Sequence, residues 1–257
     1  MARDSKKSAS RSPIRWRLWL GLFGLGLVCV STGMAALKVR HYVQTNPQFT
    51  LSRYRNGALT IGGLNYASRS RVLHVFSGDY GHSIFSVPLD ERRRRLLAID
   101  WIQDASVSRI WPDRLVVSVR ERKPVALVDF GMPYLLVDSE GVLLDPPAQA
   151  QFNFPVLHGV REEDPQPVRE EHVRAMLHLL DDMGYQSRDI SEVMTADLDN
   201  LRVIAKVDNR AIELILGDTN FGRRYQHFLA HYQENKKQSP DVKVFDLRLD
   251  DRITAKD

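Results

Sequence analysis

Cysteine is nearly absent from this chain, which contains one, Cys29, among 257 residues. That cysteine lies inside an apolar run, so the polar body that follows has no thiol with which to form a disulfide. A disulfide scaffold is therefore excluded, and the body must be stabilised by its own apolar core. With roughly 210 residues it is long enough for one or two domains.

The sequence also lacks the motifs of common catalytic and cofactor sites. It has no Gly-x-Ser-x-Gly nucleophile motif and no Gly-x-x-x-x-Gly-Lys phosphate-binding loop. His227 and His231 have the spacing of a helical zinc pair, but they stand outside a His-Glu-x-x-His frame and have no third ligand near them in the sequence. We therefore expect no enzyme activity, no cofactor and no metal, with both histidines on a solvated surface.

One long apolar run is present, from Leu18 to Leu37 (LWLGLFGLGLVCVSTGMAAL). At about 1.5 Å per helical residue it extends for roughly 30 Å, the thickness of the hydrocarbon core of a bilayer. The alternative is a cleaved signal peptide, whose apolar part is shorter, about 7 to 15 residues, and ends at a small-x-small site. The length of this run favours a retained transmembrane helix.

The charges around the run predict its orientation. Six cations precede it against a single acid, Asp4, whereas only Lys38 and Arg40 follow it closely. Because cations near a span stay on the cytoplasmic side, residues 1–17 are predicted to be a cytoplasmic tail and the body to lie outside the cytoplasm, in the periplasm of a Gram-negative cell. The body itself is slightly acidic, and it lies on the wrong side of the membrane for a nucleic-acid partner.

Residue patterns divide the body at Lys123-Pro124, after a short linker at residues 38–48. Residues 49–121 show the order strand, helix, helix, strand, strand, with Trp111-Pro112-Asp113 as the turn between the last two strands and its indole packed. Residues 122–257 are rich in strands, with helices expected at 168–183 and 220–235 and a closing strand at 242–249. The predicted fold class is α+β, with a mixed, mainly antiparallel second domain.

Six short motifs occur along the body: SIFSVPL at 83–89, WIQDASV at 101–107, RIWPDRL at 109–115, ERKPVA at 121–126, VDSEG at 137–141 and FDLR at 245–248. In these motifs the sequence resembles the FtsQ/DivIB family of bacterial cell division proteins. The resemblance implies a POTRA domain at residues 49–121 and a β-domain at 122–257. It also implies a non-enzymatic scaffold of the divisome at the septum, which binds FtsB and FtsL and meets other divisome proteins through its POTRA domain.

In that family FtsB adds alongside the last strand, which corresponds here to about residues 242–251. The partner-binding residues expected from the resemblance are Phe245, Asp246, Leu247, Arg248, Leu249, Asp250, Asp251 and Arg252. Alternation predicts that Phe245, Leu247 and Leu249 face the core, which leaves the charged side chains and an unpaired strand edge for a partner.

Three other interpretations remain open at this point. The last strand can be an edge that is protected by its charges and binds nothing. The chain can be a POTRA-bearing factor for envelope transport or assembly, although only about 135 residues follow the POTRA segment, too few for a barrel of at least eight spanning strands. It can also be an anchored enzyme whose catalytic residues converge only in space. The four arginines 92–95 are expected on a solvated helix face.

Overall fold

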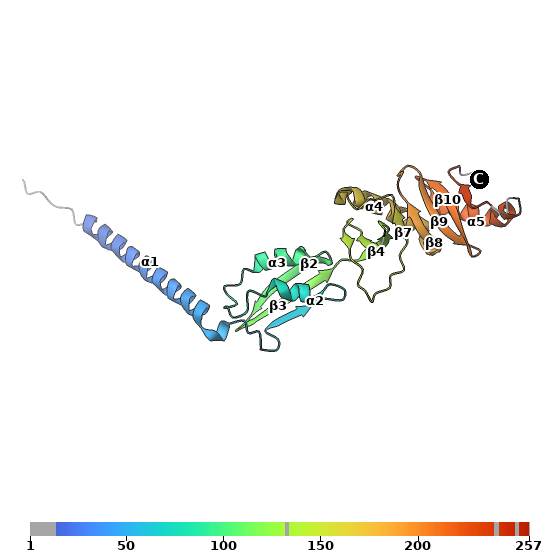
Figure 1. Ribbon diagram of the computed structural model, residues 1–257. Helices are drawn as coiled ribbons and strands as arrows, with labels where there is room; N and C mark the ends of the chain where they lie inside the picture. Colours follow the sequence, from blue (N-terminus) through green and yellow to red (C-terminus); the bar gives the residue numbers. More distant parts are fainter. Residues whose placement is uncertain (1–13, 132–133, 239–241, 250–251, 257) are drawn as a thin grey trace, which may run out of the picture. The chain divides into compact units, whose positions relative to one another are not determined.

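The computed structural model describes residues 14–131, 134–238, 242–249 and 252–256. Its first element is the long helix α1, Ile14–Thr45 (Figure 1). Among the described residues it is the one helix long and apolar enough to cross a bilayer. Its apolar side chains are exposed, as at Phe23 and Leu37, so they are available to lipid. The chain is accordingly a single-pass membrane protein.

Helix α1 is longer than the apolar run within it. It continues through Thr45, so most of the segment 38–48 that was expected to be a linker is helical instead. The sequence offers no Gly or Pro between Lys38 and Thr45 to end the helix. After Thr45, the side-chain oxygen of Asn46 accepts a hydrogen bond from the Gln48 N–H and so caps the short 3-10 helix η1, Pro47–Phe49.

A three-stranded sheet with two helices follows and confirms the predicted β-α-α-β-β order. Its strands are β1 (Leu59–Gly62), β2 (Ile102–Ile110) and β3 (Arg114–Glu121), in the order β1-β3-β2, and its helices are α2 (Arg69–Val75) and α3 (Leu89–Leu97). Strands β1 and β3 run parallel, with Leu59 opposite Leu115. The buried apolar residues of this segment include Val72, Phe76, Ile84, Leu96, Leu115 and Val117.

The turn between β2 and β3 differs from the expectation. Trp111 was predicted to be packed, but its side chain is 65% exposed. It meets the rings of Phe49 and Phe85 edge-on, with centroids 5.5 and 5.4 Å away. Trp111 is exposed because it lies at the tip of the turn between β2 and β3, where other residues contact its side chain on one side only.

By their internal contacts the residues form two compact units. Among the described residues, the first unit combines those up to Gly62 with Val72–Arg93 and Ser106–Ser118. The second combines Gly63–Arg71, Arg94–Ala105 and the described residues from Val119 onward. The expected domain boundary at 121/122 remains a prediction.

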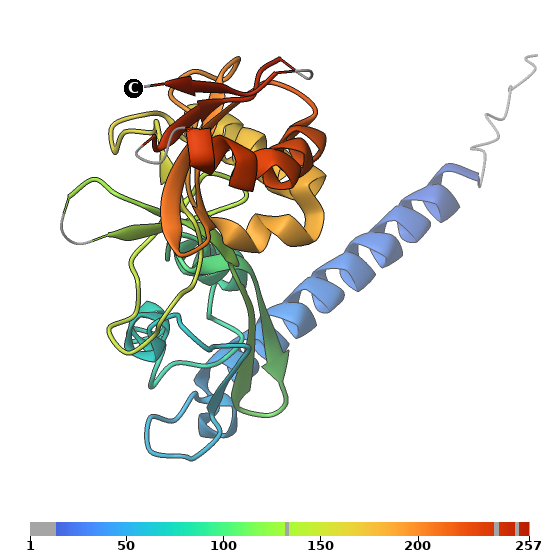
Figure 2. The ribbon, with the colours of Figure 1, turned by 90° about the vertical axis from the view of Figure 1, so that its right-hand side faces the viewer.

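A nine-stranded mixed sheet forms most of the second unit (Figures 1 and 2). Its order is β12-β11-β10-β9-β8-β7-β4-β5-β6. Pairs β4/β7, β7/β8 and β10/β11 are parallel and the other five are antiparallel. The strands are β4 Pro124–Val128, β5 Leu135–Asp138, β6 Leu143–Leu144, β7 Val156–His158, β8 Ile190–Met194, β9 Leu201–Val207, β10 Arg210–Gly217, β11 Val244–Asp246 and β12 Thr254–Lys256. The mainly antiparallel character agrees with the predicted α+β class.

Two helices cover this sheet, α4 (Gln166–Met183) and α5 (Phe221–Gln238), with the 3-10 helix η2 (Gly184–Asp189) after α4. The aromatic face predicted for the last helix is confirmed, because Phe221, Tyr225, Phe228 and Tyr232 are all buried. Each such side chain stabilises the fold by about 1.5–3 kcal/mol through burial. The Phe228 ring lies 5.2 Å from that of Phe245, which ties α5 to the end of the sheet that carries β11.

Candidate functional site

The last two strands form the end of the large sheet. Strand β11 pairs in parallel with β10, with Phe245 opposite Leu214, and its other side pairs antiparallel with β12, where Phe245 lies opposite Ala255. The expected closing strand at 242–249 is therefore wrong in two respects. The strand extends only over Val244–Asp246, and its outer side is already occupied by β12. In the described part of the chain, β12 is the edge strand at this end of the sheet and β6 is the edge strand at the other end.

The predicted site residues differ in their exposure. Phe245 and Leu247 are 2% exposed and belong to the core, as alternation predicted. Leu249 was expected to share that face but is 59% exposed, because the strand has ended before it and the backbone no longer alternates. Arg248 and Arg252 are exposed, Asp246 is half-buried, and Asp250 and Asp251 lie outside the described residues.

Asp246 is the electrostatic centre of this edge. Its carboxylate accepts hydrogen bonds from Arg248, with Nη2–Oδ2 at 2.8 Å and Nε–Oδ1 at 3.0 Å, and its Oδ2 lies 3.2 Å from the Lys256 Nζ on β12. The hydrogen bonds from Arg248 hold the pKa of Asp246 far below its usual range. Arg248 also donates from Nη1 to the Asn200 Oδ1 at 3.0 Å. One carboxylate thus joins the segment after β11 to β12.

This pKa shift predicts how the stability depends on pH. Because the folded pKa is depressed, the ionised Asp246 stabilises the fold above its unfolded pKa of about 3.9, and this contribution is lost as pH falls through the lower folded value. We expect Asp246→Asn to destabilise the chain at pH 7 and to cost progressively less as the pH falls below about 4. Urea unfolding of both proteins at pH 7 and pH 3 measures this, and an equal cost at both pH values would contradict it.

The orientation of the β12 backbone follows from the hydrogen bonds of β11. The Leu247 N–H donates to the Ile215 carbonyl at 2.9 Å, and the Lys243 carbonyl accepts from the Glu213 N–H at 2.8 Å, so the odd-numbered residues of this strand point their backbone groups toward β10. The even-numbered Val244 and Asp246 consequently point toward β12, where they face Lys256 and Thr254. The N–H and C=O of Ala255, between them, point away from the sheet.

A shallow hollow lies beside this edge. It measures about 360 Å³ and is lined by Asp246, Arg248, Leu249 and Thr254. The apolar side chain of Leu249, exposed next to a free strand, gives the hollow a hydrophobic contact within a charged rim. Such a combination of unpaired backbone groups with a side-chain pocket is suited to an extended polypeptide that adds to the sheet.

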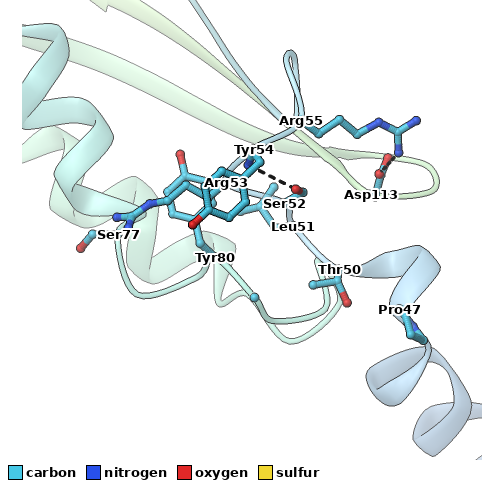
Figure 3. A pocket seen from close by; sticks show the side chains of 11 residues that line it. Pro47, Thr50, Leu51, Ser52, Arg53, Tyr54, Arg55, Ser77, Tyr80 and Asp113 are labelled. Carbon is cyan, nitrogen blue, oxygen red and sulfur yellow. Dashed lines mark hydrogen bonds and ion pairs between the residues drawn. The ribbon is translucent and has the colours of Figure 1, made fainter.

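A second concavity lies in the first unit (Figure 3). It has a volume of about 720 Å³, and its walls come mainly from the loop Thr50–Arg55 with Ser77, Tyr80, Gly81 and Asp113. Arg53 lies over the Tyr80 ring, 5.5 Å from its centroid, and Arg55 forms an ion pair with the buried Asp113. Its walls carry no histidine or cysteine and its one carboxylate is paired, so it offers a surface for contact but no acid–base or nucleophilic pair.

The metal and catalytic alternatives gain nothing from the geometry. Within residues 14–131, 134–238, 242–249 and 252–256, no group of three or more His, Cys, Asp or Glu residues is placed to hold a metal ion. His227 and His231 have ring centroids 4.6 Å apart, and the Nδ1 of His231 is hydrogen-bonded to the carbonyl of His227.

The motif residues have structural roles instead. Glu121 accepts hydrogen bonds from the backbone N–H groups of residues 65–67, at 2.7–3.0 Å. Arg122 donates to Asp138 and Glu140, both at 2.7 Å, and Trp101 Nε1 donates to the Asp145 carbonyl at 2.8 Å. The hydrogen bond from Arg122 lowers the pKa of Glu140. In the first unit, Arg109 donates to the carbonyls of Ile84 and Val87 at 2.7 Å.

What sequence reasoning missed is β12. The segment Ile253-Thr254-Ala255-Lys256 carries two β-branched residues near the end of the chain, which is a weak strand signal. Three residues are too few for alternation to be recognised, so only the pairing with β11 identifies the strand.

Comparisons with known proteins match nearly the whole chain. The family model described as "POTRA domain, FtsQ-type" matches residues 57–122, and the model "Cell division protein FtsQ/DivIB, C-terminal" matches residues 126–248. A protein named cell division protein FtsQ from Koribacter versatilis is 32% identical over 255 residues, which cover 97% of this chain and 71% of that protein. Its namesake from Geobacter sp. strain M21 is 26% identical over 99% of this chain and 94% of its own length. A third, from Rhodothermus marinus, is 29% identical over 80% and 79%.

Proposed function

Because this chain belongs to the FtsQ/DivIB family of cell division proteins, we propose that it is a non-enzymatic divisome scaffold whose β12 edge binds FtsB. A role in the divisome follows from the family. The specific partner, FtsB with FtsL in the same assembly, comes from the sequence resemblance and is supported by the geometry of the last sheet edge. The POTRA segment is proposed to contact further divisome proteins.

The single observation that carries the proposal is the outward direction of the Ala255 backbone. Its N–H and C=O point away from β11, while the backbone groups of its neighbours Thr254 and Lys256 point toward β11 and pair with it. An added strand therefore gains backbone hydrogen bonds without displacing any that the sheet already has. The partner-binding surface moves accordingly from the predicted strand at 242–249 to β12, with Arg248 and Leu249 at its rim.

The charges at this edge act on selectivity rather than on raw affinity. The Asp246 carboxylate already forms ion pairs with Arg248 and Lys256, so it adds little attraction for a partner. Beyond that internal network, Arg252 has an exposed side chain near the edge. A partner strand with acidic side chains beside an apolar residue for Leu249 fits this arrangement, since complementary rim charges guide the encounter.

The proposed location is the division septum, with the body outside the cytoplasm. The support is the basic tail before α1 and the family of the chain. One span at the amino end and a binding edge near the carboxyl end make the molecule a tether between the membrane and a partner. An anchored enzyme or an envelope transport factor would need neither septal recruitment nor FtsB.

The experiment that tests this function uses the full-length chain and a truncation after Arg252. We expect the full-length protein to co-purify with FtsB from detergent-solubilised membranes and a fluorescent fusion to gather at the septum. The truncation removes β12, so it should lose FtsB while the rest of the sheet is kept. A uniform envelope signal from the full-length fusion counts against the division role, and undiminished FtsB recovery with the truncation counts against the edge.

A further inference from the structure

Exposed aromatic side chains gather where α1 ends. Tyr42, near the end of the helix, is 55% exposed and Trp111, at the tip of the β2–β3 turn, is 65% exposed. Phe49 and Phe85 connect them, since the Phe49 centroid lies 6.3 Å from Tyr42, 5.5 Å from Phe85 and 5.5 Å from Trp111. We call these four residues the aromatic cluster. Because the rings contact one another, they form a contiguous apolar patch, and exposed patches of this kind mark interaction sites.

Hydrogen bonds fix this cluster to the transmembrane helix. The Ser83 hydroxyl donates to the Val43 carbonyl of α1 at 2.8 Å, and the Gln48 amide donates to the Tyr42 hydroxyl at 3.4 Å. Arg109, near the end of β2, donates hydrogen bonds to the carbonyls of Ile84 and Val87, on either side of Phe85. These bonds attach the β2–β3 turn to the segment that carries Phe85. The cluster therefore has a defined depth relative to α1.

That depth coincides with the headgroup layer. Tyr42 follows Leu37, the end of the apolar run, by five residues, or about 7 Å of helix. Each headgroup layer is roughly 5–7 Å thick. The part of α1 that is long and apolar enough to cross a bilayer, Leu22–Thr45, extends further and includes Tyr42. Whether the span ends at Leu37 or at Thr45, the Tyr42 ring lies near the border between lipid and water. Phe49 contacts both Tyr42 and Trp111, so Trp111 lies near the same border.

We propose that the aromatic cluster and the β2–β3 turn rest in the headgroup layer of the bilayer that α1 spans, with the Trp111 indole as the main contact. Trp and Tyr are the residues that membrane proteins concentrate at this depth, where one part of the ring is apolar and the other wet. Lys38 and Arg40, next to the end of the apolar run, provide cations for lipid phosphates at the same border. A protein partner is the competing occupant, and the continuity of the cluster with the spanning helix favours lipid.

The consequence is a second attachment of the first unit to the membrane. A single helix end leaves a domain free to pivot, whereas a helix end together with a turn in the headgroups restrains it. The inference is independent of FtsB binding, because it concerns the other end of the chain and a surface that shares no residue with β12.

Spin-label accessibility on the full-length chain in lipid nanodiscs tests the proposal. In a Cys29→Ala background, a nitroxide is placed at Ile110 or at Arg114, which flank the turn, and in a control protein at Tyr185, which is 78% exposed in the second unit. Neither probe position alters the four rings. Collisions with molecular oxygen, which enters lipid, and with a water-soluble nickel chelate are then compared.

We expect the nickel accessibility at 110 and 114 to be several-fold lower than at 185 while the oxygen accessibility stays as high or rises. Equal nickel accessibility at all three positions would show that the turn stands in water and would overturn the proposal. A loss of both oxygen and nickel accessibility would also overturn it, because it would mean that protein covers the turn.

Discussion

Replacement of Phe245 by alanine is expected to lower the free energy of unfolding of the carboxyl-terminal sheet by about 3–5 kcal/mol. The side chain is 2% exposed, and its ring lies 5.2 Å from that of Phe228 on α5. Its backbone position faces Leu214 on β10 and Ala255 on β12, so the cavity opens where the edge strand is attached. Pulse proteolysis of the full-length chain over a urea series measures the change.

Leu249 provides the matched control for Phe245. It is four residues away and aliphatic, but its side chain is 59% exposed. We expect Leu249→Ala to change the free energy of unfolding by no more than about 0.5 kcal/mol. If the two substitutions destabilise the chain equally, the packing described for this end of the sheet is wrong.

The second large effect concerns partner binding. Ala255→Pro is expected to weaken the binding of FtsB by about tenfold or more, since it deletes the outward N–H and places a ring where the partner strand approaches. Proline is tolerated at an edge position whose N–H faces solvent, so the free chain should stay folded. Titration of the full-length chain in nanodiscs with FtsB, read out by fluorescence anisotropy, gives the affinity.

Ala255→Val is the control for that experiment. It adds a side chain at the same position but keeps the N–H, and a β-branched residue suits a strand. Binding within about twofold of the original chain is expected for valine, because each backbone hydrogen bond of about 0.5–1.5 kcal/mol is retained. Equal losses with proline and valine would mean that the side-chain face of β12, not its backbone, meets the partner.

The larger elements of the fold could be predicted from periodicity. The transmembrane run, the aromatic face of α5 and the two alternating strands around Trp111-Pro112-Asp113 all have patterns long enough to identify their structure. The failures occur where patterns are short. Helix α1 overruns its apolar segment because the polar residues after Leu37 contain no helix breaker, and composition alone marked them as a linker.

The candidate site was predicted only in part, and for a related reason. Alternation correctly placed Phe245 and Leu247 in the core, but it continued the same strand to Leu249, past the point where the pairing with β10 ends. Strand β12 has three residues and no periodic signal, so its existence depends on long-range pairing with β11. The exposure of Trp111 likewise depends on tertiary placement, since a turn tryptophan can point into or out of a sheet.

The central claim is that a partner strand pairs with the outward backbone of Ala255, and amide hydrogen exchange tests it most directly. In the free chain no strand of the described residues pairs with the outer side of Ala255, while Thr254 and Lys256 face β11, so the Ala255 amide should exchange faster than both. On addition of FtsB at saturating concentration, the account predicts that Ala255 becomes the most strongly slowed amide of β12. Bound FtsB with unchanged exchange at Ala255 would contradict it.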